Sequence, residues 1–292
     1  MFKITYRDAY YNYRSEFIED EELSFYTDKL KMLQCKIISS KKVNSSDFLA
    51  FDREIVLKAL VGSHNYNLNT PESDRDYKVF TMPTFEDLYK KNQYSNSVIG
   101  ELEDLDIHDV RKLVDLFYKA NVNFLEVLFS NQIYNPQGFE EMNNILSLKN
   151  DIARMNLPYL FNACGGMYLN KMKLLTKGTE GTQHLVEKYG YDTKQALHAY
   201  RIMDFIVRFE ATGFKDFEKA MKYEGKDLEF MLEIKNGFFN LETFQKFVWH
   251  YHDSTFKHLK EKYHSQEVNL VLKDALESLI MSLVKKSIVK SI

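Results

Sequence analysis

A short apolar segment that runs into a glycine–serine turn limits what this chain can fold into more than any other feature. Residues 56–61 form a short, mostly apolar segment, which is typical of one buried β-strand, and Gly62-Ser63 follows directly. Residues 64–73 are rich in Asn, Thr, Pro and Ser, as loops are. Strand-like composition returns at residues 74–81. The chain is therefore predicted to contain two strands joined by a loop that begins at the glycine.

The later part of the chain is predicted to be helical. Only four prolines and eleven glycines occur among 292 residues, so few positions oppose helix formation. Apolar residues recur at helical spacing over residues 109–120. A longer helix is predicted over residues 192–210, with Asp192 or Thr193 as its N-cap. From about residue 136 onward the pattern is almost wholly helical, which together with the preceding strands indicates an α+β protein.

Composition excludes several classes of protein. The 39 basic and 42 acidic residues give a net charge of −3, which argues against a nucleic-acid-binding surface over the whole chain but allows a local basic groove. The two cysteines, Cys35 and Cys164, have no CxxC spacing, so neither a zinc site nor a disulfide framework is predicted. No segment reaches the roughly 20 apolar residues of a membrane helix, and the N-terminus lacks the apolar stretch of a signal peptide. We therefore expect a cytoplasmic protein that does not enter a membrane.

Two aspartates and the turn that precedes them are the candidates for chemistry. Asp74 and Asp76 are two apart, so on a strand both carboxylates project from one face. Adjacent like charges repel, and a shared proton or a bound cation relieves the repulsion. Mg²⁺ prefers oxygen ligands and usually takes one or two carboxylates together with substrate phosphates. Gly62 allows the backbone to approach a phosphate closely, and the Ser63 hydroxyl can donate to it.

Each of these features alone is more often a solvated turn than a functional site. They occur together here, after an apolar strand and with Ser73 ahead of the first aspartate. A phosphate-binding turn followed by a metal-binding acidic pair is what transfer from a nucleoside triphosphate needs, because the protein there mainly positions groups and neutralises charge.

This part of the sequence resembles the DNA polymerase beta-like nucleotidyltransferase superfamily, whose signature is Gly-Ser followed by Asp-x-Asp. The resemblance is strongest to the bacterial and phage family of predicted nucleotidyltransferases related to RNA-ligase-associated (RNA repair) polymerases. That family has the pattern Gly-Ser-x-x-Tyr-Gly and then Pro-x-Ser-Asp-x-Asp. The residues in register with the pattern are Gly62, Ser63, Tyr66, Pro71, Ser73, Asp74 and Asp76. Asn67 and Lys78 stand where the family has glycines, and an asparagine can still adopt the left-handed conformation.

The resemblance implies a fold and a domain organisation. It implies an α+β protein in which a small mixed-sheet, polymerase beta-like nucleotidyltransferase core is followed by a helical domain. Residues 51–134 would form the core, and residues 135–292 would form the helical domain that contributes to the nucleotide site. Residues 1–50 would be an N-terminal extension of uncertain structure.

The sequence does not decide which residue supplies the third carboxylate of the site. The resemblance nominates Asp106, just before the predicted helix. The residues alone leave Asp104 and Glu103 as alternatives, because Asp104, Asp106 and His108 would share one face of a strand. An exposed acidic turn that caps the next helix has the same composition. The predicted catalytic and metal-binding residues are Asp74, Asp76 and Asp106.

Residues 191–201 resemble a helical motif of the same family that carries Lys, His and Arg. Lys194, His198 and Arg201 are spaced i, i+4 and i+7, so they share one face of a helix. Three such groups can hold a triphosphate, although a solvated helix face with ordinary charge pairs has the same spacing. The predicted nucleotide-binding residues are Gly62, Ser63, Ser73, Lys194, His198 and Arg201.

The predicted function is a metal-dependent nucleotidyltransferase, with Mg²⁺ or Mn²⁺ as cofactor. It would move a nucleoside monophosphate from a nucleoside triphosphate to an acceptor hydroxyl and release pyrophosphate. The resemblance implies RNA as an acceptor, either tRNA or a broken RNA end, and a protein or a small molecule stays open. The alternatives are a non-catalytic nucleotide-binding or sensing module, a toxin-like enzyme that nucleotidylates proteins, and a metal-dependent nuclease that would not need the Gly-Ser turn.

Overall fold

The computed structural model describes residues 2–7, 9, 13–18, 20–42, 53–70, 73–100, 103–135, 138–179 and 181–290. The chain divides into two compact units, Met1–Glu54 and Ile55–Ile292. The first unit holds an antiparallel sheet in the strand order β2-β1-β3 and the helix α1. Its elements are β1 (Phe2–Arg7), β2 (Tyr13–Ile18), α1 (Leu23–Met32) and β3 (Lys36–Lys42). Its buried core consists of Ile4, Tyr6, Ile18 and Leu30.

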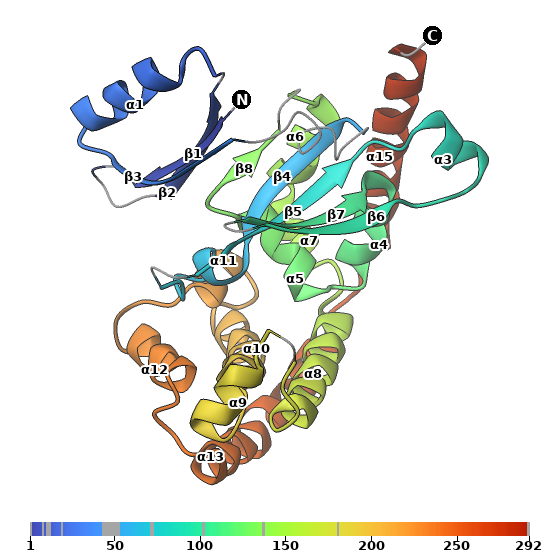
Figure 1. The fold of residues 1–292 in the computed structure, drawn as a ribbon. Coiled ribbons are helices and arrows are strands. Elements are labelled where there is room, and N and C mark those ends of the chain that lie inside the picture. The colour runs from blue at the N-terminus through green and yellow to red at the C-terminus, as the bar shows by residue number, and fades with distance from the viewer. Residues whose placement is uncertain are drawn as a thin grey trace. The chain divides into compact units, whose positions relative to one another are not determined.

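The second unit is built on a five-stranded mixed sheet (Figure 1). Its strands are β4 (Ile55–Val61), β5 (Arg75–Thr81), β6 (Ser95–Ile99), β7 (Glu103–Asp109) and β8 (Ile133–Tyr134), in the order β6-β7-β5-β4-β8. β5 and β7 are parallel, and the other neighbouring pairs are antiparallel. The two strands predicted on either side of the glycine–serine turn are therefore confirmed, and so is the α+β class with a mixed sheet.

The parallel pairing of β5 and β7 needs a crossover. The chain leaves β5, forms the short helix α3 (Phe85–Tyr89) and the edge strand β6, and then returns along β7. α3 begins at a capping box, in which the Thr84 side chain accepts from the Asp87 backbone N–H and the Asp87 carboxylate accepts from the Thr84 backbone N–H. This cap fixes the point at which the chain turns away from β5.

Helices make up most of the unit after β7. They are α4 (Leu113–Tyr118), α5 (Val122–Leu125), α6 (Glu140–Ser147), α7 (Lys149–Ala153), α8 (Leu157–Leu174), α9 (Gln183–Tyr189), α10 (Thr193–Ala211), α11 (Phe217–Met221), α12 (Gly225–Lys235), α13 (Leu241–Ser254), α14 (Lys260–His264) and α15 (Leu270–Lys290). Short 3₁₀ turns are η1 (Gly62–His64), η2 (Val110–Lys112), η3 (Glu126–Phe129) and η4 (Phe256–Leu259). The predicted helix over residues 109–120 is present as η2 and α4. The predicted domain boundary at residue 134 coincides with the end of β8 and stays a prediction.

α10 is the central helix of this unit because it is buried along most of its length. Asp192, one of the two residues predicted for this position, is its N-cap and accepts a hydrogen bond from the Gln195 backbone N–H. The helix packs against α8, α11 and α12 (Figure 1). Phe205 in its second half belongs to the same buried cluster as Leu57 of β4 and Phe80 of β5. The sheet and the helices therefore share one core, which fixes α10 relative to the strands.

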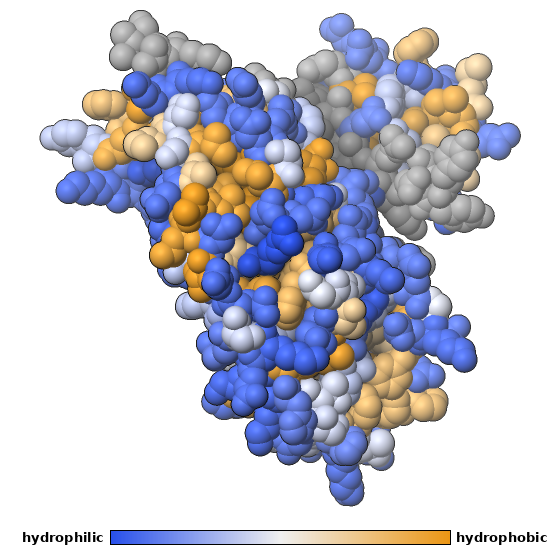
Figure 2. Space-filling model, turned by 180° about the vertical axis from the view of Figure 1, so that it is seen from behind, coloured by the Kyte–Doolittle hydropathy of each residue, from blue (hydrophilic) through white to orange (hydrophobic). Residues whose placement is uncertain are grey.

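The surface of the second unit is largely hydrophilic, and hydrophobic residues gather along the face where α15 runs (Figure 2). Met281 of α15 is one exposed apolar residue there. No helix in the described part of the chain is both long and apolar enough to cross a membrane.

Truncating Phe205 tests whether the shared core stabilises the second unit. Phe205 is 2% exposed and packs against the rings of Phe209 and Phe217. Phe205→Ala should lower the free energy of unfolding by about 3–5 kcal/mol, because it leaves a cavity in a packed core. Denaturant unfolding followed by circular dichroism measures this loss. Phe238→Ala is the control, since Phe238 is 73% exposed and its truncation should change stability by no more than about 0.5 kcal/mol.

Candidate active site

Gly62 lies directly against the carboxylate of Asp76. β4 and β5 are antiparallel with Val61 opposite Asp76, so the turn that follows β4 meets the start of β5. Gly62 has a φ of +70°, and a Cβ at this position would lie 2.6 Å from Asp76 Oδ2. Glycine is therefore required both for the left-handed backbone and for the close approach of the carboxylate.

A second aspartate faces Asp76 from the neighbouring strand. The parallel register of β5 and β7 places Asp104 opposite Asp76, and the two side chains project from the same face of the sheet. Burial raises the pKa of Asp76, and the negative charges of Asp104 and Asp74 raise it further, while Lys194 opposes the rise. Crowded negative charge of this kind favours a bound cation.

Asp106, the residue nominated as third carboxylate, is held by two basic side chains. It lies opposite Lys78, one alternate position farther along the same face. Its Oδ2 accepts from Lys78 Nζ at 2.6 Å, and its Oδ1 lies 2.9 Å from His108 Nε2. The hydrogen bond with His108 and the contact with Lys78 hold the pKa of Asp106 well below its usual range. Its metal-binding role stays a prediction, but Asp104 has the position opposite Asp76.

The donor set suits a hard divalent cation that brings further ligands of its own. In the residues that the structure describes, no three His, Cys, Asp or Glu side chains group closely enough to hold a metal by themselves. Glu103, another alternative for the third carboxylate, has Oε2 3.3 Å from Lys58 Nζ. Because Mg²⁺ usually takes one or two carboxylates together with waters and substrate phosphates, Asp76 and Asp104 fit it without a closed cage.

Basic side chains from three helices surround His198. They are Lys171 of α8, Lys194 and Arg201 of α10, and Lys235 of α12. Burial and these four positive charges hold the pKa of His198 well below its ordinary value, so the ring is neutral near pH 7. Lys194 is exposed, and its positive charge opposes the rise in the pKa of Asp76. Positive charge therefore adjoins Asp76 and Asp104, as the binding of a polyphosphate requires. No sequence pattern indicates Lys235, which reaches this region only through the packing of α12.

The three predicted cationic residues of α10 differ in exposure although they share a helix face. Lys194 is exposed and His198 is partly buried, whereas Arg201 is only 5% exposed. The Arg201 guanidinium carbon lies 3.8 Å from the centroid of the Tyr66 ring. The helix therefore passes from the surface into the core along this face. Contact between Arg201 and a nucleotide stays a prediction, and the structure gives this side chain buried partners.

Ser73 organises the loop between the turn and the acidic pair. Its Oγ accepts from the Thr70 backbone N–H at 2.8 Å and lies 3.4 Å from Lys235 Nζ. Lys235 Nζ also donates to the Leu68 carbonyl at 2.8 Å, which ties the loop to α12. The Ser63 hydroxyl forms no hydrogen bond with any residue that the structure describes, so it can take a ligand. The nucleotide contacts of both serines stay predictions.

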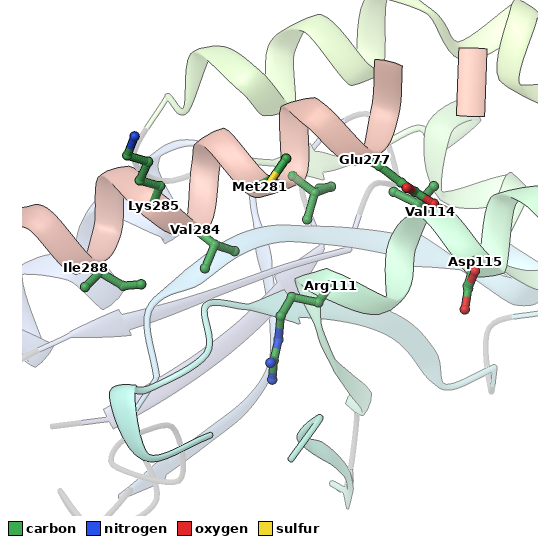
Figure 3. Close-up of a pocket in the computed structure, with 9 residues that line it drawn as sticks. Arg111, Val114, Asp115, Glu277, Met281, Val284, Lys285 and Ile288 are labelled. Carbon is green, nitrogen blue, oxygen red and sulfur yellow. The ribbon is translucent and has the colours of Figure 1, made fainter. Parts of the chain in front are cut away.

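A groove of about 570 Å³ lies between α4 and α15 (Figure 3). Its apolar lining includes Val114, Met281, Val284 and Ile288, with Arg111 and Glu277 among its polar residues. None of the predicted site residues lines this groove. The acidic pair and the basic side chains of α10 are therefore a separate site from it.

The mixed sheet with aspartates beside a glycine–serine turn, followed by helices, defines the polymerase beta-like nucleotidyltransferase class. The chain belongs to the family described as RlaP, the RNA repair pathway DNA polymerase beta family, which matches residues 36–282. The solved structures include a similar nucleotidyltransferase-like protein from Exiguobacterium sibiricum 255-15, which is 13% identical. That match covers 83% of this chain and 89% of the other, with a TM-score of 0.27, which is too low to support any argument. No curated protein matches the chain.

Substituting Gly62 separates the two reasons why residue 62 has to be a glycine. Gly62→Ala should lose about 1–2 kcal/mol of stability from the left-handed backbone, and about 1–3 kcal/mol more from the clash with Asp76. Gly213→Ala is the matched control, since Gly213 has a φ of +64° and a Cβ there would meet nothing within 4 Å. Denaturant unfolding of both variants measures the difference. Equal losses would show that the Asp76 carboxylate does not constrain residue 62.

Proposed function

We propose that this protein is a divalent-metal-dependent nucleotidyltransferase that uses Mg²⁺ or Mn²⁺. It moves a nucleoside monophosphate from a nucleoside triphosphate to an acceptor hydroxyl and releases pyrophosphate. The observation that carries the proposal is the position of Asp76, which lies against Gly62 and opposite Asp104 while Lys194 acts on it from α10. Membership of the RlaP family supports the same reaction class.

The residues of the site have distinct roles in this reaction. Asp74, Asp76 and Asp104 would contribute carboxylates to the metal together with waters and the triphosphate, and the metal would supply positive charge to the phosphates. The Ser63 hydroxyl donates to the phosphates, and Lys194 neutralises their charge. The oxygen of the acceptor hydroxyl forms a bond to the α-phosphorus, and the bond from that phosphorus to the bridging oxygen of the β-phosphate breaks. Pyrophosphate leaves, and the hydroxyl proton passes to a carboxylate of the site.

Asp104 is the better candidate for the third carboxylate. It faces Asp76 across the parallel strands, and its charge contributes to the raised pKa of Asp76. Asp106 faces Lys78 and forms its closest contacts with that lysine and with His108. A metal at Asp106 would have to compete with both of these basic groups, whereas a metal at Asp104 relieves a repulsion.

The acceptor that we propose is an RNA end, either on tRNA or at a break. The family to which the chain belongs is described as part of an RNA repair pathway. The net charge of −3 adds no support, so contact with an RNA backbone would depend on local basic groups such as Lys171 and Lys194. A protein or small-molecule acceptor and a non-catalytic nucleotide sensor are the competing outcomes of the experiment below.

An incorporation assay tests the reaction. The purified protein is incubated with Mg²⁺ and each α-labelled nucleoside triphosphate, with and without total cellular RNA. We expect label in RNA, no incorporation when EDTA replaces the metal, and a loss of at least about 100-fold in Asp76→Asn, because the metal-bound charge on the phosphates is then lost. Circular dichroism of Asp76→Asn checks that the fold is kept.

Each other result of that assay points elsewhere. Label on protein would replace the RNA acceptor with a polypeptide hydroxyl. Nucleotide binding without label in any fraction would favour the sensing module. Cleavage of RNA without a nucleoside triphosphate would indicate a nuclease, and incorporation that survives in Asp76→Asn would contradict the proposed metal site.

A pair of substitutions decides between the two candidates for the third carboxylate. Asp104→Asn should reduce turnover by about 100-fold or more without loss of stability, because it removes a site charge and relieves the repulsion with Asp76. Asp106→Asn should instead lower the free energy of unfolding at pH 7 and reduce turnover much less. Turnover and denaturant unfolding are measured for both, and the reverse pattern would restore Asp106 as the ligand.

The Asp106 effect has a defined pH dependence. The pKa of Asp106 is lowered in the folded protein, so its contacts with Lys78 and His108 stabilise the fold above the ordinary aspartate pKa of about 3.9. This stabilisation is lost as the pH falls below that value toward the folded-state pKa. The stability difference between wild type and Asp106→Asn should therefore shrink as the pH falls through that range.

A further inference from the structure

The carboxylate of Glu126 lies buried behind the glycine–serine turn. Glu126 begins η3 and is only 3% exposed. Its Oε2 accepts from the Gly62 backbone N–H at 3.0 Å and from Asn65 Nδ2 at 3.4 Å. Asn65 Nδ2 also lies 3.3 Å from the Glu126 carbonyl, and Asn65 Oδ1 accepts from the Asn131 backbone N–H at 3.2 Å. One carboxylate and one amide therefore fix the turn from the side of the core.

Arg201 supplies the opposite charge from the helical part of the unit. Burial raises the pKa of Glu126, and the positive charge of Arg201 opposes this, together with the hydrogen bond from Gly62. The Arg201 guanidinium also stacks on the Tyr66 ring, four residues after Gly62. The turn is thus connected to α10 through both a charge and an aromatic ring.

A buried carboxylate is a costly way to fill this space. Apolar side chains of similar volume could pack the same core without the loss of hydration that buried charges suffer. Only an acceptor, however, can fix the direction of the Gly62 N–H, and a nearby cation offsets part of the cost of burying a carboxylate there.

We propose that Glu126 and Arg201 are positioning residues, which hold the Gly62–Ser63 turn and, through Gly62, the carboxylate of Asp76 in the geometry that nucleotidyl transfer needs. The inference rests on the proposed function of the site. Because Glu126 takes the Gly62 N–H, that group does not bind phosphate, and the Ser63 hydroxyl is left to do so. In this proposal Glu126 and Arg201 act through the turn, which replaces the predicted direct contact of Arg201 with the nucleotide.

The test compares Glu126→Gln with a matched substitution elsewhere. The glutamine keeps the size of the side chain but removes its charge, so that only one neutral, weaker acceptor oxygen is left for the Gly62 N–H and Asn65, and the attraction to Arg201 is lost. We expect kcat for nucleotide incorporation to fall by about 100-fold with a much smaller change in KM, because the reacting groups are misplaced by a shift of the turn. Amide hydrogen exchange over residues 61–66, followed by mass spectrometry, should become faster by about tenfold, because a neutral oxygen holds the Gly62 N–H more weakly than a carboxylate does.

Glu141→Gln is the control for a buried carboxylate that is unrelated to the turn. Glu141 is 5% exposed, and its Oε1 lies 2.5 Å from Lys286 Nζ and 3.0 Å from Ser282 Oγ of α15. This variant should leave kcat and the exchange of residues 61–66 unchanged. Unchanged kcat and exchange in Glu126→Gln would overturn the proposal, and so would equal effects in the two variants.

A second variant covers the case in which Glu126→Gln does not fold. Arg201→Lys keeps the positive charge but loses the planar group that stacks on Tyr66, and it should show the same fall in kcat and faster exchange of the turn. Wild-type values for both readouts would overturn the role of Arg201. If the wild-type protein itself incorporates no nucleotide, the proposed function fails, whereas the exchange measurement still decides whether these two residues hold the turn.

Discussion

The second unit depends on how the backbone of Gly62 is held between two carboxylates. On one side Glu126 accepts the Gly62 N–H from within the core, and on the other side Asp76 Oδ2 lies where a side chain of residue 62 would be. The first contact ties the turn to α10 through Arg201, and the second ties it to β5. A shift of the turn would therefore disturb the start of β5, the carboxylates of Asp76 and Asp104, and the central helix α10 together.

Charge is distributed unevenly around this turn, and the distribution gives the site its chemical character. Asp76 and Asp104 crowd negative charge on one face of the sheet, while Lys194 and its neighbours bring positive charge from the helices. His198 stays neutral among those cations. A metal ion and a polyphosphate together satisfy both halves, because the cation neutralises the carboxylates and the phosphates neutralise the lysines.

Local patterns in the sequence predicted the parts of this site that lie close together along the chain. The apolar segment and the turn gave β4 and Gly62, and the spacing of the aspartates gave the strand that became β5. Asn67, which replaces a glycine of the family pattern, does adopt a left-handed φ of +64°. Lys194 and Arg201 do lie on one helix, as their spacing predicted, but the spacing could not show that one is exposed and the other buried. Periodicity defines a face of a helix and says nothing about what covers it.

The sequence by itself determined the class of fold and the family and led to the prediction of Asp74 and Asp76 as site residues, because strand patterns, turn residues and motif spacing are properties of short segments. Only the tertiary structure decided that Asp104 faces Asp76, since the register of two parallel strands is set by pairing across a long crossover. It likewise decided that Glu126 lies behind Gly62 and that Lys235 reaches the loop before the aspartates. These contacts join distant segments through a common core, and no local pattern records which distant residues will meet when that core closes.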